Sequence, residues 1–187
     1  LEEGRFELHR QTIMPLQAAE VGSHFELLIR MRDEQGKLVP PDHFIAAAER
    51  YNLMPAIDRW VVENAFRWLV SAADERAGLA MCAINLSGQS MGDDQFLPFV
   101  IQQFRTSGLD ASKICFEITE TSAIANFSQA SRFIQALHGL GCKFALDDFG
   151  TGLSSFGYLK HFPVDFLKID GSFVKDLVND SVDREMV

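Results

Sequence analysis

Two adjacent carboxylates, Asp147 and Asp148, follow a short apolar run and precede a loop that contains glycines. The run, residues 144–146, is too short for a helix and is typical of a buried strand. Neighbouring carboxylates at the end of a buried strand repel each other, so both stay ionised only beside a cation or strong hydrogen-bond donors. A divalent metal ion that prefers oxygen ligands would supply that charge. A strand end with one Asp capping the turn explains this stretch equally well.

Four other apolar segments also carry polar side chains that alternate with large apolar ones. Side chains alternate between the two faces of a strand, so one face of each segment combines polar groups with apolar or small residues. The polar residues are Glu26, Arg30, Asn85, Glu117 and Lys168, and the segment 144–148 adds Asp147. A barrel of parallel strands gathers such groups at its C-terminal mouth. Because an unpaired buried charge costs roughly several kcal/mol, five such strands favour a metal-centred site over a structural polar core.

The order of the expected elements agrees with a barrel. From residue 81 onward, strands and helices alternate, which predicts a parallel α/β fold. The expected strands, about six in number, are 6–15, 25–31, 81–87, 114–119, the run at 144–146 and 166–169. The expected helices are 40–51, one that begins near Pro55, 93–106, 128–140, a short one at 154–159 and a last piece after Ser172.

Composition limits the class of protein. The 187 residues are 47% hydrophobic and 23% charged, as in a globular protein with a sizeable core. The net charge of −9 argues against binding a nucleic-acid polymer through a basic surface. The three cysteines, without a metal-type spacing, are expected to be buried free thiols in a reducing compartment. No signal peptide and no membrane-spanning run is recognised, so we expect a cytoplasmic domain, alone or as part of a membrane-anchored protein.

Five short motifs follow one another along the chain: Phe-Glu-Leu-Leu-Ile-Arg at 25–30, Ile-Asn-Leu-Ser at 84–87, Phe-Glu-Ile-Thr-Glu at 116–120, Asp-Asp-Phe-Gly-Thr-Gly at 147–152 and Leu-Lys-Ile-Asp at 167–170. Together they resemble the EAL domain family of cyclic di-GMP phosphodiesterases, with Leu27 where Ala or Val is usual. The resemblance covers the whole chain and implies one domain over residues 1–187. It implies a modified TIM (β/α)8 barrel with an antiparallel first strand, of which about six of the eight strands are present.

The resemblance also implies two metal ions, either Mg²⁺ or Mn²⁺. The ligands of one ion would be Glu26, Asn85, Glu117 and Asp147. Asp147 would bridge to a second ion, and Asp148 would be a further ligand of that ion. Lys168 would orient the attacking water, and the product would be linear pGpG. Two ions about 4 Å apart can generate a hydroxide and stabilise the charge that develops at phosphorus.

Further positions take binding or supporting roles by the same resemblance. Arg30 would contact a phosphate of cyclic di-GMP. Gln11 would help to bind the ligand, although Thr12 stands where the family usually has Pro. Glu120 would hold the loop that contains Gly150, Thr151 and Gly152. This loop and the next helix would form a homodimer contact, and regulatory domains would precede the chain.

A second departure and two alternatives accompany this interpretation. The family's seventh and eighth strands, a Glu ligand of the second ion and a late Gln are absent, so we expect residues 1–187 alone to be inactive, poorly soluble and part of a longer polypeptide. One alternative is a non-catalytic cyclic di-GMP receptor. It is disfavoured because every ligand position within the chain is kept. The other is a metal-dependent barrel hydrolase that acts on a different phosphoester.

Overall fold

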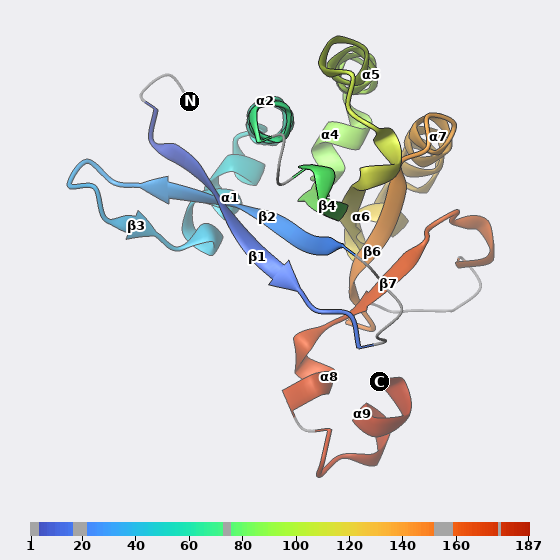
Figure 1. The fold of residues 1–187 in the computed structure, drawn as a ribbon. Helices are drawn as coiled ribbons and strands as arrows, with labels where there is room; N and C mark the ends of the chain where they lie inside the picture. The colour runs from blue at the N-terminus through green and yellow to red at the C-terminus, as the bar shows by residue number, and fades with distance from the viewer. Residues whose placement is uncertain (1–3, 17–21, 73–75, 152–158, 176) are drawn as a thin grey trace.

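A single mixed sheet forms the centre of the molecule (Figure 1). The computed structural model describes residues 4–16, 22–72, 76–151, 159–175 and 177–187. Within them, the strands are β1 (Phe6–Ile13), β2 (Ser23–Arg32), β3 (Leu38–Val39), β4 (Leu79–Asn85), β5 (Ile114–Thr119), β6 (Lys143–Phe149) and β7 (Phe166–Ile169). The strand order is β1-β2-β4-β5-β6-β7, and β3 pairs with β2. β1 runs antiparallel to β2, and the pairs from β2–β4 to β6–β7 are parallel, which confirms the expected α/β fold.

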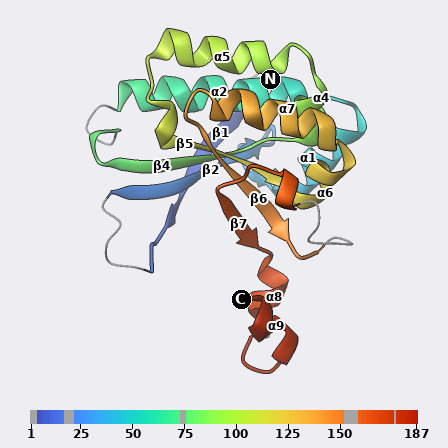
Figure 2. The same cartoon turned by 90° about the vertical axis from the view of Figure 1, so that its right-hand side faces the viewer.

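Three helices cover one face of this sheet. The helices are α1 (Pro41–Arg50), α2 (Met54–Ser71), α4 (Gly88–Gly92), α5 (Phe96–Ser107), α6 (Glu120–Ala125), α7 (Phe127–His138), α8 (Gly171–Lys175) and α9 (Ser181–Met186). Two short 3-10 segments are η1 (Ala111–Lys113) and η2 (Leu159–His161). Figure 2 shows α2, α5 and α7 side by side on one side of the sheet, whereas α8 and α9 extend from the other side beyond β7. No helix in the described ranges is long and apolar enough to cross a membrane.

Local sequence explains where the helices begin and end. α1 starts with Pro41, whose fixed φ suits the first helical turn. α5 ends at Gly108, which adopts the left-handed conformation with φ 66°. Ser87 and Thr119 cap α4 and α6 by accepting hydrogen bonds from backbone N–H groups three residues later. These two caps lie close to the ends of β4 and β5, so each strand turns directly into a helix.

The apolar residues form two separate clusters on the two faces of the sheet. The larger cluster lies between the sheet and its helices and includes the fully buried rings of Phe66, Phe96, Phe116 and Phe144. The smaller one, on the opposite face, consists of Ala83, Cys115 and Ala145, with Met81 packed against them. The small side chains of β4, β5 and β6 leave room beside the next inward-facing position on each strand. That next position is polar on all three strands.

The six expected strands are confirmed. β5 and β7 have the expected ends, whereas the ends of the other four are shifted. β1 stops at Ile13, two residues before Pro15, which lacks the N–H group that pairing requires. The helix expected from residue 93 begins at Phe96, because Asp93 instead accepts a hydrogen bond from the backbone of Gln95 in a turn. β3, α4, α6 and α9 were not expected, and α8 corresponds to the last helical piece expected after Ser172. Most of the helix expected at 154–159 lies outside the described residues. The three cysteines are buried free thiols, as expected.

The buried aromatic cluster yields a stability prediction. Phe144 is fully buried, and its ring lies 5.8 Å from that of Phe116 and 6.3 Å from that of Phe133. We expect Phe144→Ala to lower the free energy of unfolding by about 3–5 kcal/mol in urea titrations, because it removes a buried ring and leaves a cavity. Phe166 on neighbouring β7 is 39% exposed and serves as the control, with an expected loss of about 1 kcal/mol. Equal losses for the two variants would contradict this picture of the core.

Candidate functional site

Three carboxylates from three strands surround one ammonium group at the edge of the inward-facing side of the sheet. The Nζ atom of Lys168 on β7 donates to Asp147 Oδ2 at 3.0 Å and to Glu26 Oε2 at 3.4 Å, and it also donates to Glu117 Oε2. Asn85 on β4 joins the group, because its Nδ2 donates to Glu26 Oε1 at 2.6 Å. Five neighbouring strands of the sheet therefore each contribute one polar side chain, and we call these five residues the acidic cluster.

Strand register explains why these residues meet. In the parallel pairing of β4 with β5, Asn85 is level with Glu117. β6 is shifted so that Asp147 is level with Thr119, at the end of β5. Asn85, Glu117, Asp147 and Lys168 lie at or near the C-terminal ends of their strands, and the carboxyl ends of parallel strands lie on one edge. Glu26 lies one residue before the end of the parallel pairing of β2 with β4. The expectation that polar groups converge at this edge is confirmed.

Burial makes the electrostatics of the acidic cluster unusual. The side chain of Glu117 is 2% exposed, and this burial raises its pKa to about 7, although the hydrogen bond and charge of Lys168 act in the opposite direction. The charges of Glu26 and Asp147 raise it further. Burial opposes the charge on Lys168, but the hydrogen bond to Glu117 and the surrounding carboxylates more than offset it, so the pKa of Lys168 is raised. Excess negative charge thus faces a single cation.

Asp148 lies beside the acidic cluster but is not among the three carboxylates that Lys168 contacts. Its backbone is left-handed, with φ 53°, which is uncommon for a residue with a Cβ atom. Its N–H group donates to Asp147 Oδ1 at 3.0 Å. Burial, together with the charges of Asp147 and Asp170, raises the pKa of Asp148. The adjacent carboxylates therefore occupy different environments, since only Asp147 contacts the ammonium of Lys168.

The supporting residues expected from the sequence lie close to the acidic cluster. Arg30 is on the same strand face as Glu26, and Gln11 is paired opposite Glu26 in the β1–β2 register. Glu120 is fully buried and accepts a hydrogen bond from the N–H group of Gly150 at 3.0 Å. The Thr151 hydroxyl donates to the carbonyl oxygen of Asp148 at 2.9 Å. Gly152 lies outside the described residues.

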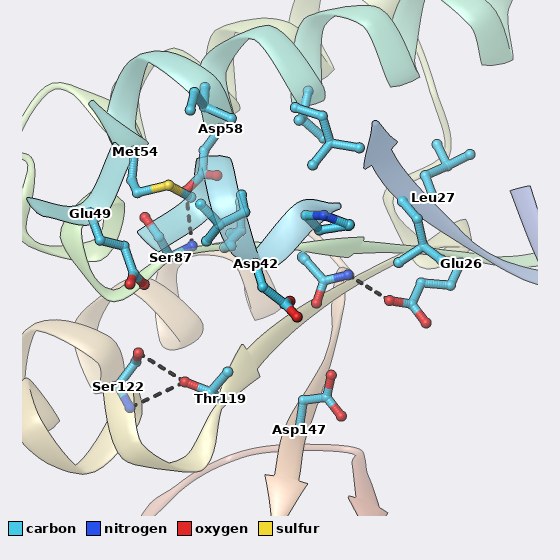
Figure 3. Close-up of a pocket in the computed structure, with 18 of the residues that line it drawn as sticks. Glu26, Leu27, Asp42, Glu49, Met54, Asp58, Ser87, Thr119, Ser122 and Asp147 are labelled. Atoms are coloured by element: carbon cyan, nitrogen blue, oxygen red, sulfur yellow. Dashed lines mark hydrogen bonds between the residues drawn. The ribbon is translucent and has the colours of Figure 1, made fainter. Parts of the chain in front are cut away.

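A groove of about 510 Å³ leads away from the acidic cluster (Figure 3). Glu26, Asn85, Asp147, Asp148 and Arg30 are among the residues that line it. α1, α2, the residue that caps α4 and helix α6 form other parts of its wall. The residues that they contribute include Asp42, Ile45, Glu49, Met54, Asp58, Ser87 and Ser122. None of these residues was predicted from the sequence to be part of the site. Asp58 carried a signal, since it is a charged residue within the apolar stripe of α2.

The three carboxylates of the acidic cluster contact the ammonium of Lys168 at the point where they converge. Accordingly, no three His, Cys, Asp or Glu side chains in the described part of the chain form a ready-made metal-binding group. Its donor atoms are nonetheless those that hard divalent cations prefer, namely carboxylate and amide oxygens. The carboxylate and amide oxygens can bind a cation, and the guanidinium of Arg30 can bind an anion in the groove. The ammonium of Lys168 lies beside the carboxylates that would bind the cation.

Comparison with known proteins agrees with this geometry. The family model described as EAL domain matches residues 1–187. The chain is 40% identical to the cyclic di-GMP phosphodiesterase PdeB of Shewanella oneidensis and 37% identical to the cyclic di-GMP phosphodiesterase PdeF of Escherichia coli. Both alignments cover 100% of this chain, but only 22% and 24% of the respective relatives.

Solved structures share the fold. The crystal structure of the FimX EAL domain from Pseudomonas aeruginosa bound to c-di-GMP superimposes with a TM-score of 0.89 at 34% identity, over 99% of this chain and 73% of that one. The c-di-GMP complex of the PaMucR phosphodiesterase gives a TM-score of 0.86 at 30% identity, over 99% of this chain and 74% of that one. The sheet is thus part of a TIM-barrel-like α/β fold. By its full-length match and its relatives, the chain belongs to the EAL domain family.

Proposed function

We propose that this domain hydrolyses cyclic di-GMP to linear pGpG in a reaction that depends on Mg²⁺ or Mn²⁺. The observation that carries the proposal is the acidic cluster, in which four oxygen-bearing side chains and one lysine converge beside a groove. A groove of about 510 Å³ is within the usual range for small-molecule sites. The named activity of PdeB and PdeF and the ligand in the FimX structure support cyclic di-GMP as the substrate.

The donor set of the acidic cluster fits a divalent cation. Three carboxylates face one ammonium, and burial holds the pKa of Glu117 near 7, so additional positive charge would stabilise the ionised cluster. One ion would be held by Glu26, Asn85, Glu117 and Asp147, and a second by Asp147 and Asp148. When bound, such ions act as Lewis acids toward a phosphoryl oxygen and lower the pKa of water.

The protein side chains have separate roles in this proposal. The ammonium of Lys168 donates hydrogen bonds within the acidic cluster and can orient a water molecule there for attack on phosphorus. Arg30 lines the same groove, and its permanent charge suits a substrate phosphate. Gln11, level with Glu26 on the neighbouring strand, assists ligand binding. Glu120 keeps the loop after β6 in place through Gly150.

Wider features of the protein are also part of the proposal. We place the homodimer contact at the loop after Asp148 and at the helix expected at 154–159. Residues 152–158 lie outside the described part. The chain spans less than a quarter of PdeB and PdeF, which supports additional regulatory domains in the whole protein. Three buried free thiols support a reducing, cytoplasmic location.

Turnover of cyclic di-GMP tests the proposal directly. We expect the complete domain, in the longer polypeptide to which residues 1–187 belong, to convert cyclic di-GMP to pGpG with Mn²⁺ or Mg²⁺. It should lose this activity in EDTA, as measured by separating the two nucleotides chromatographically. Binding of cyclic di-GMP without turnover would replace the enzyme by a receptor. Hydrolysis of a generic phosphodiester such as bis(p-nitrophenyl) phosphate, with cyclic di-GMP left intact, would leave a hydrolase of another substrate class.

The role of Lys168 can be separated from general electrostatics. Lys168→Met keeps the apolar stem and removes the ammonium, so we expect kcat to fall by about 100-fold or more while KM changes little. Lys143→Met is the matched control, because Lys143 lies on neighbouring β6 and its ammonium is 5.5 Å from the ring centre of Phe166 instead of in the acidic cluster. A raised KM with unchanged kcat in Lys168→Met would make Lys168 a substrate-binding residue.

The raised pKa of Glu117 predicts a pH-dependent stability of the metal-free protein. Its pKa of about 7 exceeds the ordinary value of 4.5, so the folded state holds this proton more tightly than the unfolded state does. The contribution of the protonated Glu117 to the stability of the folded state is complete below pH 4.5, the ordinary pKa. It is lost as the pH rises to about 7, the pKa in the folded state. In EDTA, Glu117→Gln should therefore gain stability relative to the wild type between pH 5 and pH 8, by about 3 kcal/mol at most. A difference in melting temperature that is independent of pH would refute this.

A further inference from the structure

Asp58 is a buried carboxylate in the wall of the groove, outside the acidic cluster. It lies on α2 and is only 3% exposed, between the buried apolar residues Ile57 and Val61. Burial raises its pKa, so its ionised form is held there against a desolvation cost. An acid in this position of an otherwise apolar helix face requires a local reason, because a Leu or Val would pack there without that cost.

The contacts of Asp58 lead to the turn between β4 and α4. Its Oδ2 atom accepts a hydrogen bond from the backbone N–H of Ser87 at 2.9 Å and another from the hydroxyl of Ser90 at 2.6 Å. Ser90 is fully buried, and Ser87 is the N-cap of α4. Figure 3 shows Asp58 reaching down from α2 toward Ser87. The long helix α2 thus fixes the first turn of a helix only five residues long.

This turn directly follows a residue of the acidic cluster. Three consecutive residues are each fixed by a different partner. The side chain of Asn85 donates to Glu26 at 2.6 Å, and the N–H of Leu86 donates to the carbonyl oxygen of Glu117 at 2.8 Å. The N–H of Ser87 donates to Asp58. The two residues that follow Asn85 are therefore each fixed by a backbone N–H group, that of Leu86 to β5 and that of Ser87 to α2. A displacement of Ser87 would move the Asn85 amide relative to Glu26 and Glu117.

We propose that Asp58 is a positioning residue of this site, which acts through the backbone of Ser87 to hold the Asn85 amide in place for cation binding. The inference rests on the proposed function, because it assigns Asn85 to the cation. Asp58 itself touches neither the acidic cluster's ammonium nor the proposed ion. Its effect is transmitted through two peptide units, and a misplacement well under 1 Å is enough to weaken a coordination site.

Three variants separate positioning from ordinary stability. Asp58→Ala removes the acceptor of both hydrogen bonds. Asp58→Asn retains a carbonyl oxygen of nearly the same size that can accept both. Val62→Ala is the matched control, since Val62 is fully buried on the same helix but has no polar side-chain atom to support the turn. All three should be compared with the wild type in Mn²⁺ binding, followed by the electron paramagnetic resonance signal of free Mn²⁺, and in kcat and KM for cyclic di-GMP.

We expect Asp58→Ala to weaken Mn²⁺ binding by about 10- to 100-fold, with a matching fall in kcat at limiting Mn²⁺. Asp58→Asn should stay within about threefold of the wild type, because the conservative variant restores the acceptor. Val62→Ala should unfold at a lower temperature but bind Mn²⁺ normally. Equal Mn²⁺ affinity in Asp58→Ala and the wild type would overturn the inference, as would equal weakening in Asp58→Ala and Val62→Ala.

Hydrogen exchange of the backbone amide of Ser87 tests, independently of Mn²⁺ binding, whether Asp58 holds this turn in place. Relative to the buried amide of Phe116, it should exchange faster in Asp58→Ala but not in Val62→Ala. If wild-type protein binds no Mn²⁺, the proposed function fails, and exchange alone then decides whether Asp58 positions the turn. An unchanged Ser87 amide in Asp58→Ala overturns the inference in either case.

Discussion

The ammonium of Lys168 holds together three carboxylates that would otherwise repel one another. Lys168 comes from β7, whereas its partners come from β2, β5 and β6, so the interaction ties the two halves of the sheet at one point. Without the ammonium, the three carboxylates would lack the compensating charge that they contact, which is unfavourable for buried groups. The register of the strands places these charged groups close together. The small side chains next to them leave the space that they occupy.

The fold makes room for the acidic cluster with small residues and stabilises it with large ones. Ala83, Cys115 and Ala145 form a row of small side chains two positions before Asn85, Glu117 and Asp147 on the same strands. On the other face, buried aromatic rings between sheet and helices supply the hydrophobic stabilisation. Unfavourable features on the polar side include the raised pKa of Glu117 and the left-handed backbone of Asp148. Backbone strain such as that of Asp148 is found at many functional sites.

The sequence was sufficient for the long strands and the acidic cluster because both depend on a period of two. Alternation within β2, β4, β5, β6 and β7 identified the inward residues, and motif order identified the family. Short elements such as β3 and α4 were missed, since two to five residues contain no readable period. Asp58 was missed for another reason. Its partners Ser87 and Ser90 are 29 and 32 residues away, and only the packing of α2 over the end of β4 brings them together.

Two buried carboxylates outside the acidic cluster each accept a hydrogen bond from a backbone N–H group that follows a strand. Asp58 accepts the N–H of Ser87 after β4, and Glu120 accepts the N–H of Gly150 after β6. β4 and β6 flank β5, so the two acids fix the main chain on both sides of Glu117. Each acceptor ties its turn to another part of the chain, 29 residues away for Asp58 and 30 for Glu120, which the local hydrogen bonds of a turn do not do. The acidic cluster can therefore carry strong mutual repulsion without spreading apart, since the backbone that follows its strands is held from outside.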